Sequence, residues 1–529
     1  MLQSKNMVTL AINDMPVQVE EGATILQAAR KLGVEIPTFC HMDGRKPFTS
    51  CMICVVRDAA TGQLLPSCSH PAGEGMVIET GSEPVREFRR ETLNLLLSEH
   101  TGDCAAPCER ICPTHMDIPR MLQQIMEGRL ADAIVTVKRD IAFPAILGRI
   151  CSAPCENGCH RGDHDAAVQI CLLKRFVADV DLAAQFPYIP ECAPASGKRV
   201  AIIGAGCAGG AAAYHLRRYG HGCDIFDEHD ASGGAVRYAM TEEQCPRQVI
   251  EDEFVIVEKM GARFIFNTRV GRDIAMDRLR KEYDAIVLAC GELTQDACKT
   301  LGLKYGQRGV KIDDDTLQSS DPQVFVCGGA LRPTNAAVRS EAQAKAAAYA
   351  IDQLFKTGKA QAPPSRFDSK ILRVSEDEIE QFMQGINPHA RVEPAAGVSQ
   401  GFTLEEARQE ASRCMQCGCR KPDDCKLRDY AEEYGAGQKV YAAAERQPYT
   451  KLVHPCGVVF EPGKCLKCGV CVRLAREAGE ELGLAFIGRG FDVRIAVPFN
   501  ADLEKGLMKA AEKVVTTCPT GAMSFHARR

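Results

Sequence analysis

The chain has 529 residues, of which 45% are hydrophobic and 25% charged, and its formal net charge is −5. This length exceeds a single hydrophobic core and predicts several domains, and the composition is ordinary for a globular protein. The charge offers no basic surface for nucleic acid, and no apolar run is long enough to span a membrane. The start of the chain lacks a signal-peptide pattern, so we expect a cytoplasmic protein.

Cysteine is the unusual residue, with 27 copies. Thiols stay reduced in the cytoplasm, so a disulfide framework is not expected there. The cysteines fall into groups with short internal spacings, which indicates metal ligation.

Residues 6–35 alternate apolar and polar side chains and then become helical, which predicts a hairpin and a helix of a β-grasp domain. Four cysteines follow on loops: Cys40, Cys51, Cys54 and Cys68. Soft thiolates converging from loops suit a two-iron cluster, and plain buried cysteines are the alternative. Segments 36–40 and 51–54 resemble the N-terminal two-iron domain of the complex I large iron–sulfur subunit and of iron-only hydrogenases.

Residues 84–185 are predicted to be helical and contain two cysteine triplets with spacings of four. The triplets are Cys104, Cys108 and Cys112, then Cys151, Cys155 and Cys159. This spacing places thiols on one helix face, so two facing triplets can bind two clusters. In the complex I and hydrogenase families a His-x3-Cys four-iron site stands here; His100 and Cys104 begin that pattern before the sequence departs from it.

From this point to about residue 357 the chain resembles the small subunit of glutamate synthase and its relatives, through segments 143–151 and 154–156. Those relatives include dihydropyrimidine dehydrogenase and the NADH-dependent ferredoxin:NADP oxidoreductase. The resemblance implies interleaved clusters, one held by Cys104, Cys108 and Cys159 and the other by Cys112, Cys151 and Cys155. His100 is the candidate fourth ligand of the first and Cys171 of the second. The alternatives are a solvated helix-end histidine and a small core cysteine.

A buried strand is predicted at 200–203, followed by a glycine-rich turn into a helix. Glycines there let the backbone approach a pyrophosphate at the helix N-terminus. Asp227 ends the next strand and is the expected ribose ligand, with Glu228 as the reserve. Together with the turns that the family resemblance supplies, the candidate flavin contacts are Gly204, Gly206, Gly209, Asp227, Glu228, Gly233, Gly234, Gly291, Gly328 and Gly329.

FAD is the cofactor this layout favours, and a nicotinamide nucleotide is the competitor. The resembled family has Gly-Asp where this chain has Gly328-Gly329, so we expect weakened FAD binding. No second GxGxxG motif occurs, and the inserted NAD(P) domain of those relatives is missing.

Two cysteine groups remain near the C-terminus. The first comprises Cys414, Cys417, Cys419 and Cys425, for which a four-iron cluster is favoured and structural zinc is the competitor. The second comprises Cys465, Cys468, Cys471 and the distant Cys518, which predict a ferredoxin fold reduced to one four-iron cluster. The segment 463–522 resembles the ferredoxin-like domain of iron-only hydrogenases and complex I.

We therefore predict a multidomain α+β and α/β protein. Its expected parts are a β-grasp 2Fe-2S domain (1–82), a helical domain with two 4Fe-4S clusters (83–196), a Rossmann-like FAD domain (197–358), a linker (359–402), a Cys-rich 4Fe-4S segment (403–455) and a 4Fe-4S ferredoxin-like domain (456–529).

The expected cofactors are FAD, one 2Fe-2S cluster and up to four 4Fe-4S clusters. Clusters pass single electrons and a flavin exchanges one or two, so the chain is expected to be an electron-transfer subunit. By resemblance its partners are an NAD(P)H-oxidising FMN flavoprotein, a hydrogenase, a formate dehydrogenase or ferredoxin, and electron bifurcation stays open. The alternatives are a self-sufficient NAD(P)H oxidoreductase and a structural subunit with a vestigial flavin fold.

Overall fold

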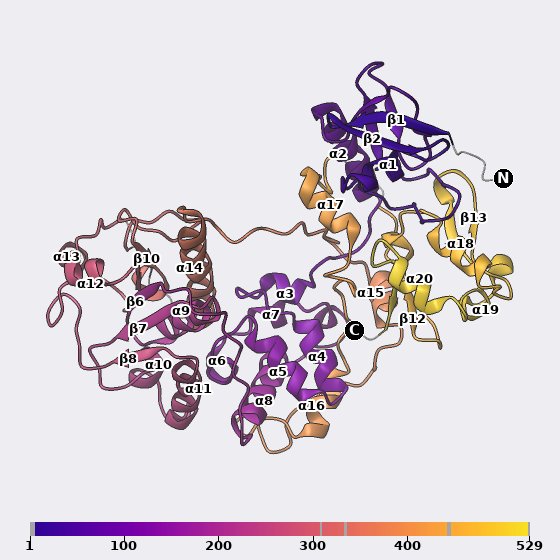
Figure 1. Cartoon of the computed structure of the whole chain (residues 1–529). Helices are drawn as coiled ribbons and strands as arrows, with labels where there is room; N and C mark the ends of the chain where they lie inside the picture. Colours follow the sequence, from indigo (N-terminus) through magenta and orange to yellow (C-terminus); the bar gives the residue numbers. More distant parts are fainter. Residues whose placement is uncertain (1–5, 307–308, 333–335, 442–445, 527–529) are drawn as a thin grey trace. The chain divides into compact units, whose positions relative to one another are not determined.

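The computed structural model describes residues 6–306, 309–332, 336–441 and 446–526. The chain forms two compact units, coloured along the sequence in Figure 1. Unit 1 comprises Met1–Ala105, Arg366–Gly385 and Gln416–Arg529, and unit 2 comprises Ala106–Ser365 and Ile386–Met415. Across the described residues, no helix combines the length and the apolar character that crossing a bilayer requires.

Unit 1 begins with a five-stranded sheet in the order β2-β1-β5-β3-β4. Its strands are β1 (Met7–Ile12), β2 (Met15–Glu20), β3 (Val55–Asp58), β4 (Leu64–Pro66) and β5 (Val77–Glu79). Helix α1 (Ile25–Lys31) starts at Thr24, whose side chain and that of Gln27 form a capping box. Alternate residues of the strands and one face of α1 fill the core, so the predicted hairpin and helix are confirmed.

The remainder of unit 1 surrounds a second core. It contains α2 (Glu83–Ser98), α15 (Glu376–Met383), α17 (Lys426–Tyr434), α18 (Val470–Glu477), α19 (Leu503–Gly506) and α20 (Ala511–Thr517). Its strands are β11 (Leu452–Val453), β12 (Val458–Phe460), β13 (Ala485–Ile487), β14 (Arg494–Ala496) and β15 (Met523–Phe525). The core joins α2, α17 and the C-terminal elements to the cysteine loop that follows α1.

Unit 2 opens with a helical layer. Its helices are α3 (Pro107–Ile111), α4 (Ile118–Met126), α5 (Leu130–Lys138), α6 (Pro144–Ile150), α7 (Pro154–Asn157), α8 (Ile170–Leu182) and α16 (Leu404–Ala411). Helix α6 packs on α8, and the short α3 packs on α7. Prolines at the first turns of α3, α6 and α7 suit positions whose N–H groups have no partner within the helix.

A parallel sheet in the order β10-β9-β6-β7-β8 forms the rest of unit 2 (Figure 1). Its strands are β6 (Arg199–Ile203), β7 (Gly222–Phe226), β8 (Arg263–Ile265), β9 (Ala285–Leu288) and β10 (Val324–Val326). Its helices are α9 (Cys207–Arg218), α10 (Ala235–Tyr238), α11 (Arg247–Lys259), α12 (Met276–Glu282), α13 (Gln295–Thr300) and α14 (Ala337–Thr357). The central strands are continuous apolar runs because helices cover both faces of such a sheet.

The observed boundaries differ from the predicted ones in two places. The expected linker 359–402 contains α15 and the buried side chains of Ile371, Ile379 and Phe382. Helix α2 belongs to unit 1, although it was expected in the helical domain. Both differences arise because the apolar faces of these segments pack onto long-range partners, which composition alone does not reveal.

Candidate cofactor sites

The four N-terminal cysteines gather in one buried place within unit 1. Cys40, Cys51, Cys54 and Cys68 are each less than a tenth exposed. Hydrogen bonds from the thiols of Cys51 and Cys68 lower the pKa of Cys40, and a hydrogen bond from Cys68 lowers the pKa of Cys54 to about 7. The two loops thus bring four soft ligands together, as a two-iron cluster requires.

The four C-terminal cysteines line a single apolar cavity. Cys465, Cys468, Cys471 and Cys518 face this cavity together with Phe460, Val470 and Ile495. Burial raises the pKa of Cys465 to about 11 and that of Cys468 to about 12. Such thiols are poor anions on their own and need a metal's positive charge to be held as thiolates.

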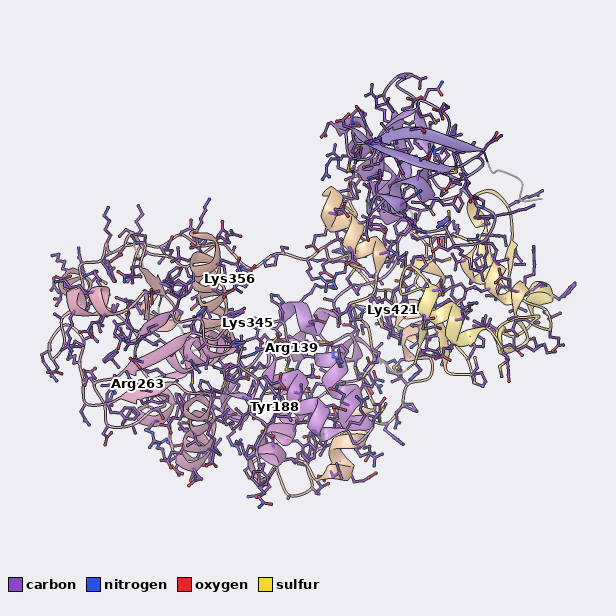
Figure 2. All side chains as sticks on the ribbon, in the orientation of Figure 1. Arg139, Tyr188, Arg263, Lys345, Lys356 and Lys421 are labelled. Atoms are coloured by element: carbon purple, nitrogen blue, oxygen red, sulfur yellow. The ribbon has the colours of Figure 1, made fainter. Side chains whose placement is uncertain are left out.

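Backbone and cationic groups hold this cavity in shape. Lys467 has a left-handed backbone (φ 54°), and its N–H donates to Cys465 Sγ at 3.4 Å. Lys421, labelled in Figure 2, donates through Nζ to the carbonyl oxygens of Cys518 (2.9 Å) and Val515 (3.2 Å). N–H groups and cations beside the sulfurs are the contacts that stabilise a negatively charged iron–sulfur cluster.

The loop that carries Cys40 and Cys51, called the two-iron loop below, packs directly on this C-terminal domain. Phe48 stacks on Phe486 with ring centroids 5.8 Å apart, and Arg473 of α18 donates to the carbonyl of Cys40. Arg45 pairs with Glu477 at the end of the same helix. These contacts place two cysteine sites side by side within unit 1.

A third group of thiols lies in unit 2. Lys174 on α8 is buried and interacts with the thiols of Cys171, Cys151, Cys155 and Cys112. A hydrogen bond from the thiol of Cys171 lowers the pKa of Cys151 to about 5. The structure therefore brings the candidate Cys171 to Cys112, Cys151 and Cys155.

The loop that carries Cys112 is bonded to the Rossmann-type domain within the same unit. Lys345 on α14, labelled in Figure 2, donates to Asp140 at 2.6 Å and to the carbonyl of Thr114 at 3.1 Å. Cys112 Sγ lies 3.2 Å from the hydroxyl of Thr114. This thiol site is therefore held against a helix of the Rossmann-type layer.

The remaining predicted ligands are distributed differently from the expected grouping. Cys108, Cys159 and Cys414 pack on the helical core of unit 2. Cys104, Cys419 and Cys425 lie in unit 1, where Cys419 donates its backbone N–H to the carbonyl of Cys104. Cys414 and Cys419 thus fall in different units, and Cys104 falls in a different unit from Cys108 and Cys159. The reason is that the chain passes from one unit to the other within each of these motifs.

Cys417 and His100 complete the predicted set, both in unit 1. Cys417 interacts with the buried side chains of Tyr449 and Lys451. Burial and the nearby Lys464 lower the pKa of His100 to about 4, so its imidazole is neutral at pH 7 and has the form that ligates metals.

Within the described ranges, no group of three or more His, Cys, Asp or Glu side chains has the geometry to hold a single metal ion. A four-iron cluster takes one thiolate on each iron, so its ligands are spread around a larger body. Independently of this, the gathered thiols fit a polynuclear cluster by their soft chemistry and their number.

The glycine-rich turn of unit 2 leaves no room for side chains. A Cβ at Gly209 would lie 1.9 Å from the carbonyl oxygen of Gly204, and one at Gly204 would lie 2.5 Å from that of Ala289. A Cβ at Gly234 would lie 2.8 Å from the Cα of Gly206. Helix α9 starts at this turn without a side-chain cap, so its first N–H groups are available to a phosphate.

The two acidic candidates at the end of β7 occupy different positions. Asp227 is a tenth exposed and accepts the backbone N–H of Ala205 at 2.6 Å, which places its carboxylate at the turn. Glu228 is half exposed and pairs with Arg269 at 3.2 Å. The geometry favours Asp227 as the ribose contact of a bound dinucleotide.

Gly291, Gly328 and Gly329 lie at the ends of β9 and β10, beside the turn. A Cβ at Gly329 would approach the backbone of Gly291 to 3.1 Å, and one at Gly328 would approach Ala208 Cβ to 2.7 Å. The backbone itself is therefore packed tightly where the resembled family carries an aspartate. Gly233 also belongs to this region, since its N–H donates to the carbonyl of Ala205 at 2.9 Å.

The sequence reasoning did not identify Lys174. Its signal is a basic residue three positions after Cys171, one turn along the helix and within a mostly apolar face. Lys174 is only 5% exposed, and a buried ammonium needs negative partners, a role that the neighbouring cysteines fill when they are thiolates.

Three family models match the chain. They are the 2Fe-2S iron-sulfur cluster binding domain at residues 5–83, the 4Fe-4S domain II of dihydropyrimidine dehydrogenase at 98–186, and the NAD(P)-binding Rossmann-like domain at 202–272. Fold and sites together define a multidomain redox chain that combines iron–sulfur domains with a nucleotide-binding domain.

The similar proteins are oxidoreductases. The chain is 30% identical to the beta subunit of the NADP(+)-dependent formate dehydrogenase of Moorella thermoacetica, over 60% of this chain and 47% of that protein. It is 34% identical to the beta subunit of the NADPH-Fe(3+) oxidoreductase of Geobacter sulfurreducens, over 39% of this chain and 30% of that protein. It is 32% identical to the small chain of the Bacillus subtilis NADPH glutamate synthase, over 35% of this chain and 37% of that protein.

The matched segments thus span less than half the length of each of these relatives. These similarities fit an FAD/iron–sulfur oxidoreductase family, as the glutamate synthase-like segments indicated. The multidomain α/β class with 2Fe-2S, 4Fe-4S and Rossmann-like domains is confirmed.

Proposed function

We propose that the chain is an electron-transfer subunit of a multi-subunit oxidoreductase, with FAD in unit 2 and iron–sulfur clusters in both units. The observation that carries the proposal is that separate groups of buried thiols share one chain with a glycine turn that fits a dinucleotide. Clusters accept single electrons, whereas a flavin exchanges one or two, so a flavin beside clusters splits or joins electron pairs.

The contacts inside each unit support short transfer steps. In unit 1 the two-iron loop contacts the C-terminal ferredoxin-like domain through Phe48 and Arg473. In unit 2 the thiol group around Lys174 is connected through Thr114 and Lys345 to α14, which packs on α9 of the Rossmann-type layer. Within each unit, two of the candidate centres are therefore joined by direct contacts.

The proposed partners follow from the relatives' names. Two of them are beta subunits, one of a formate dehydrogenase and one of an NADPH-Fe(3+) oxidoreductase. We infer that this chain works with a separate catalytic subunit that oxidises formate or NAD(P)H, or with a hydrogenase or ferredoxin.

Anaerobic purification of the chain with its native partners tests the proposal. We expect FAD, iron and acid-labile sulfide in the preparation, together with at least one co-purifying redox subunit. Iron and sulfide without FAD would indicate the structural alternative. Colourless protein without iron would refute the proposal.

A self-sufficient NAD(P)H oxidoreductase is the second candidate, because the matched Rossmann model is one for NAD(P) binding. Stopped-flow mixing of the isolated chain with NADPH or NADH separates the two. Rapid bleaching of the flavin favours the self-sufficient enzyme, and a stable oxidised spectrum favours the relay subunit.

A further inference from the structure

Two segments of unit 1 that are far apart in sequence run side by side. Asp103 pairs with Gly418 in a parallel bridge, and the N–H of Cys419 donates to the carbonyl of Cys104 at 3.1 Å. Residues 105–418, which include all of unit 2, lie between these two cysteines in the sequence. The pairing therefore joins the points where the chain leaves unit 1 and returns to it.

Three thiols meet at this junction. Burial raises the pKa of Cys425 to about 12, and the thiols of Cys419 and Cys104 contribute to that rise. Burial likewise raises the pKa of Cys104 to about 11, with a contribution from Cys419. Each of the three thiols thus lies within electrostatic reach of at least one other, and Cys419 and Cys425 are each 7% exposed.

The surroundings are built for sulfur and for negative charge. The N–H of Ser369 points at Cys104 Sγ at 3.4 Å. A Cβ at Gly521 would lie 2.4 Å from Cys419 Sγ, so the backbone approaches that sulfur as no other residue type would allow. The ammonium of Lys464 is 1% exposed and interacts with Cys419 as well as with Glu461.

His100 stands at the edge of the same place. A Cβ at Gly102, two residues after His100, would lie 2.4 Å from Lys464 Cε, and Lys464 also interacts with Cys419. The Nδ1 of His100 is shielded from solvent and has no hydrogen-bond partner among the residues that the structure describes. The segment between His100 and Cys104 packs on the Lys464 loop, since the N–H of Thr101 donates to the carbonyl of Gly463 at 2.8 Å.

We propose that Cys104, Cys419 and Cys425, with His100 as the fourth ligand, form one iron–sulfur site that closes unit 1 across the inserted unit 2. This inference rests on the proposed function and specifies one of its clusters. It replaces two expected groupings, because it removes Cys104 from the Cys108 and Cys159 set and separates Cys419 and Cys425 from Cys414 and Cys417.

The site has a structural consequence. A metal link between residues before and after a long insertion removes conformational freedom from the unfolded chain, as other loop-closing links do. Loss of this one cluster would therefore loosen the junction in unit 1, while the N-terminal two-iron site of the same unit would keep all its ligands.

The test uses the full chain, purified anaerobically, with iron content and low-temperature EPR of the reduced protein as readouts. The variants are Cys104→Ser, Cys419→Ser and Cys414→Ser, and Cys456→Ser is the control. Cys456 is a half-buried thiol of unit 1 that donates to the carbonyl of Leu507 at 4.0 Å.

We expect C104S and C419S to lose the same EPR signal and about four irons per chain, because each removes a ligand of one four-iron cluster. C414S should retain that signal, and C456S should match the parent. The two-iron signal and flavin content of each preparation report whether the chain has folded. Retention in C104S of the signal that C419S loses would overturn the proposal, whereas an iron-free parent chain would instead refute the proposed function.

Substitution of His100 tests the fourth ligand separately. We expect His100→Ala to lose about one iron or to shift the g-values of that same signal, because three thiolates hold only three of the four irons. His100→Cys should restore the iron content with an altered midpoint potential. An unchanged signal and potential in both variants would exclude His100 as a ligand.

Discussion

The charge of Lys174 offers the sharpest test of the unit 2 thiol site. Burial acts to lower the pKa of Lys174, but the thiols of Cys171, Cys151, Cys155 and Cys112 outweigh it and hold that pKa above the ordinary range. Lys174 is therefore expected to remain protonated, and its positive charge should favour the reduced, more negative form of any bound cluster.

The size of this effect follows from Coulomb's law. Two unit charges about 4 Å apart interact by ~4 kcal/mol at an effective dielectric constant of ~20, and by ~2 kcal/mol at twice that distance. A one-electron potential shifts by about 59 mV for each ~1.4 kcal/mol. Lys174→Met should therefore lower one cluster's midpoint potential by roughly 80 mV or more.

Redox titration followed by EPR measures this shift in the full chain. Lys174→Arg is the matched control because it keeps the charge, and we expect its potential to stay near that of the parent. The other clusters should titrate unchanged in both variants. Equal potentials for every cluster in K174M and the parent would show that this ammonium does not act on a redox centre.

Three further predictions concern unit 2. Burial would raise the pKa of Asp224, but its bonds to Arg263 (2.7 and 2.6 Å, labelled in Figure 2) hold it at about 2. Its stabilising contribution is therefore complete above pH 3.8 and is lost as the pH falls through about 2. Because the guanidinium is largely exposed, D224N should cost only ~1 kcal/mol at pH 7, and urea unfolding that matches the parent at pH 7 would contradict this. Gly209→Ala places a methyl against the carbonyl oxygen of Gly204, so extracted flavin should fall sharply while iron content holds; full flavin content would exclude this turn as the binding site. Glu253 accepts two N–H groups at the start of α6 (both 2.8 Å), and burial raises its pKa to about 8, so stability should fall as the pH rises from 4.5 to about 8. Thermal melts of E253Q should lack this slope, and an equal slope in E253Q and the parent would assign it to other groups.

Local patterns were enough to predict much of the fold. The hairpin of β1 and β2, the strand at 200–203 and the glycine turn after it all appear where the sequence placed them. Each depends on periodicity or turn chemistry within about 20 residues, where backbone geometry leaves few alternatives. The close spacing of Cys465, Cys468 and Cys471 likewise brings three thiols to one cavity without help from distant segments.

Ligand partnerships across long distances could not be read in the same way. The spacing of Cys414, Cys417, Cys419 and Cys425 suggests one site, yet the chain passes from unit 2 to unit 1 after Met415. Cys171 and Lys174 also become neighbours of Cys112 only because α8 packs in the helical layer that carries the cysteine loops.

By itself, the sequence determined that the chain carries cysteine motifs typical of iron–sulfur clusters. It also showed one GxGxxG turn typical of dinucleotide binding and no second GxGxxG motif. Which thiols share a site was decided by tertiary structure, because a cluster is bound by groups that are close in space. Cys104 and Cys419 show the difference: residues 105–418 separate them in the chain, and a backbone hydrogen bond of 3.1 Å joins them in the fold.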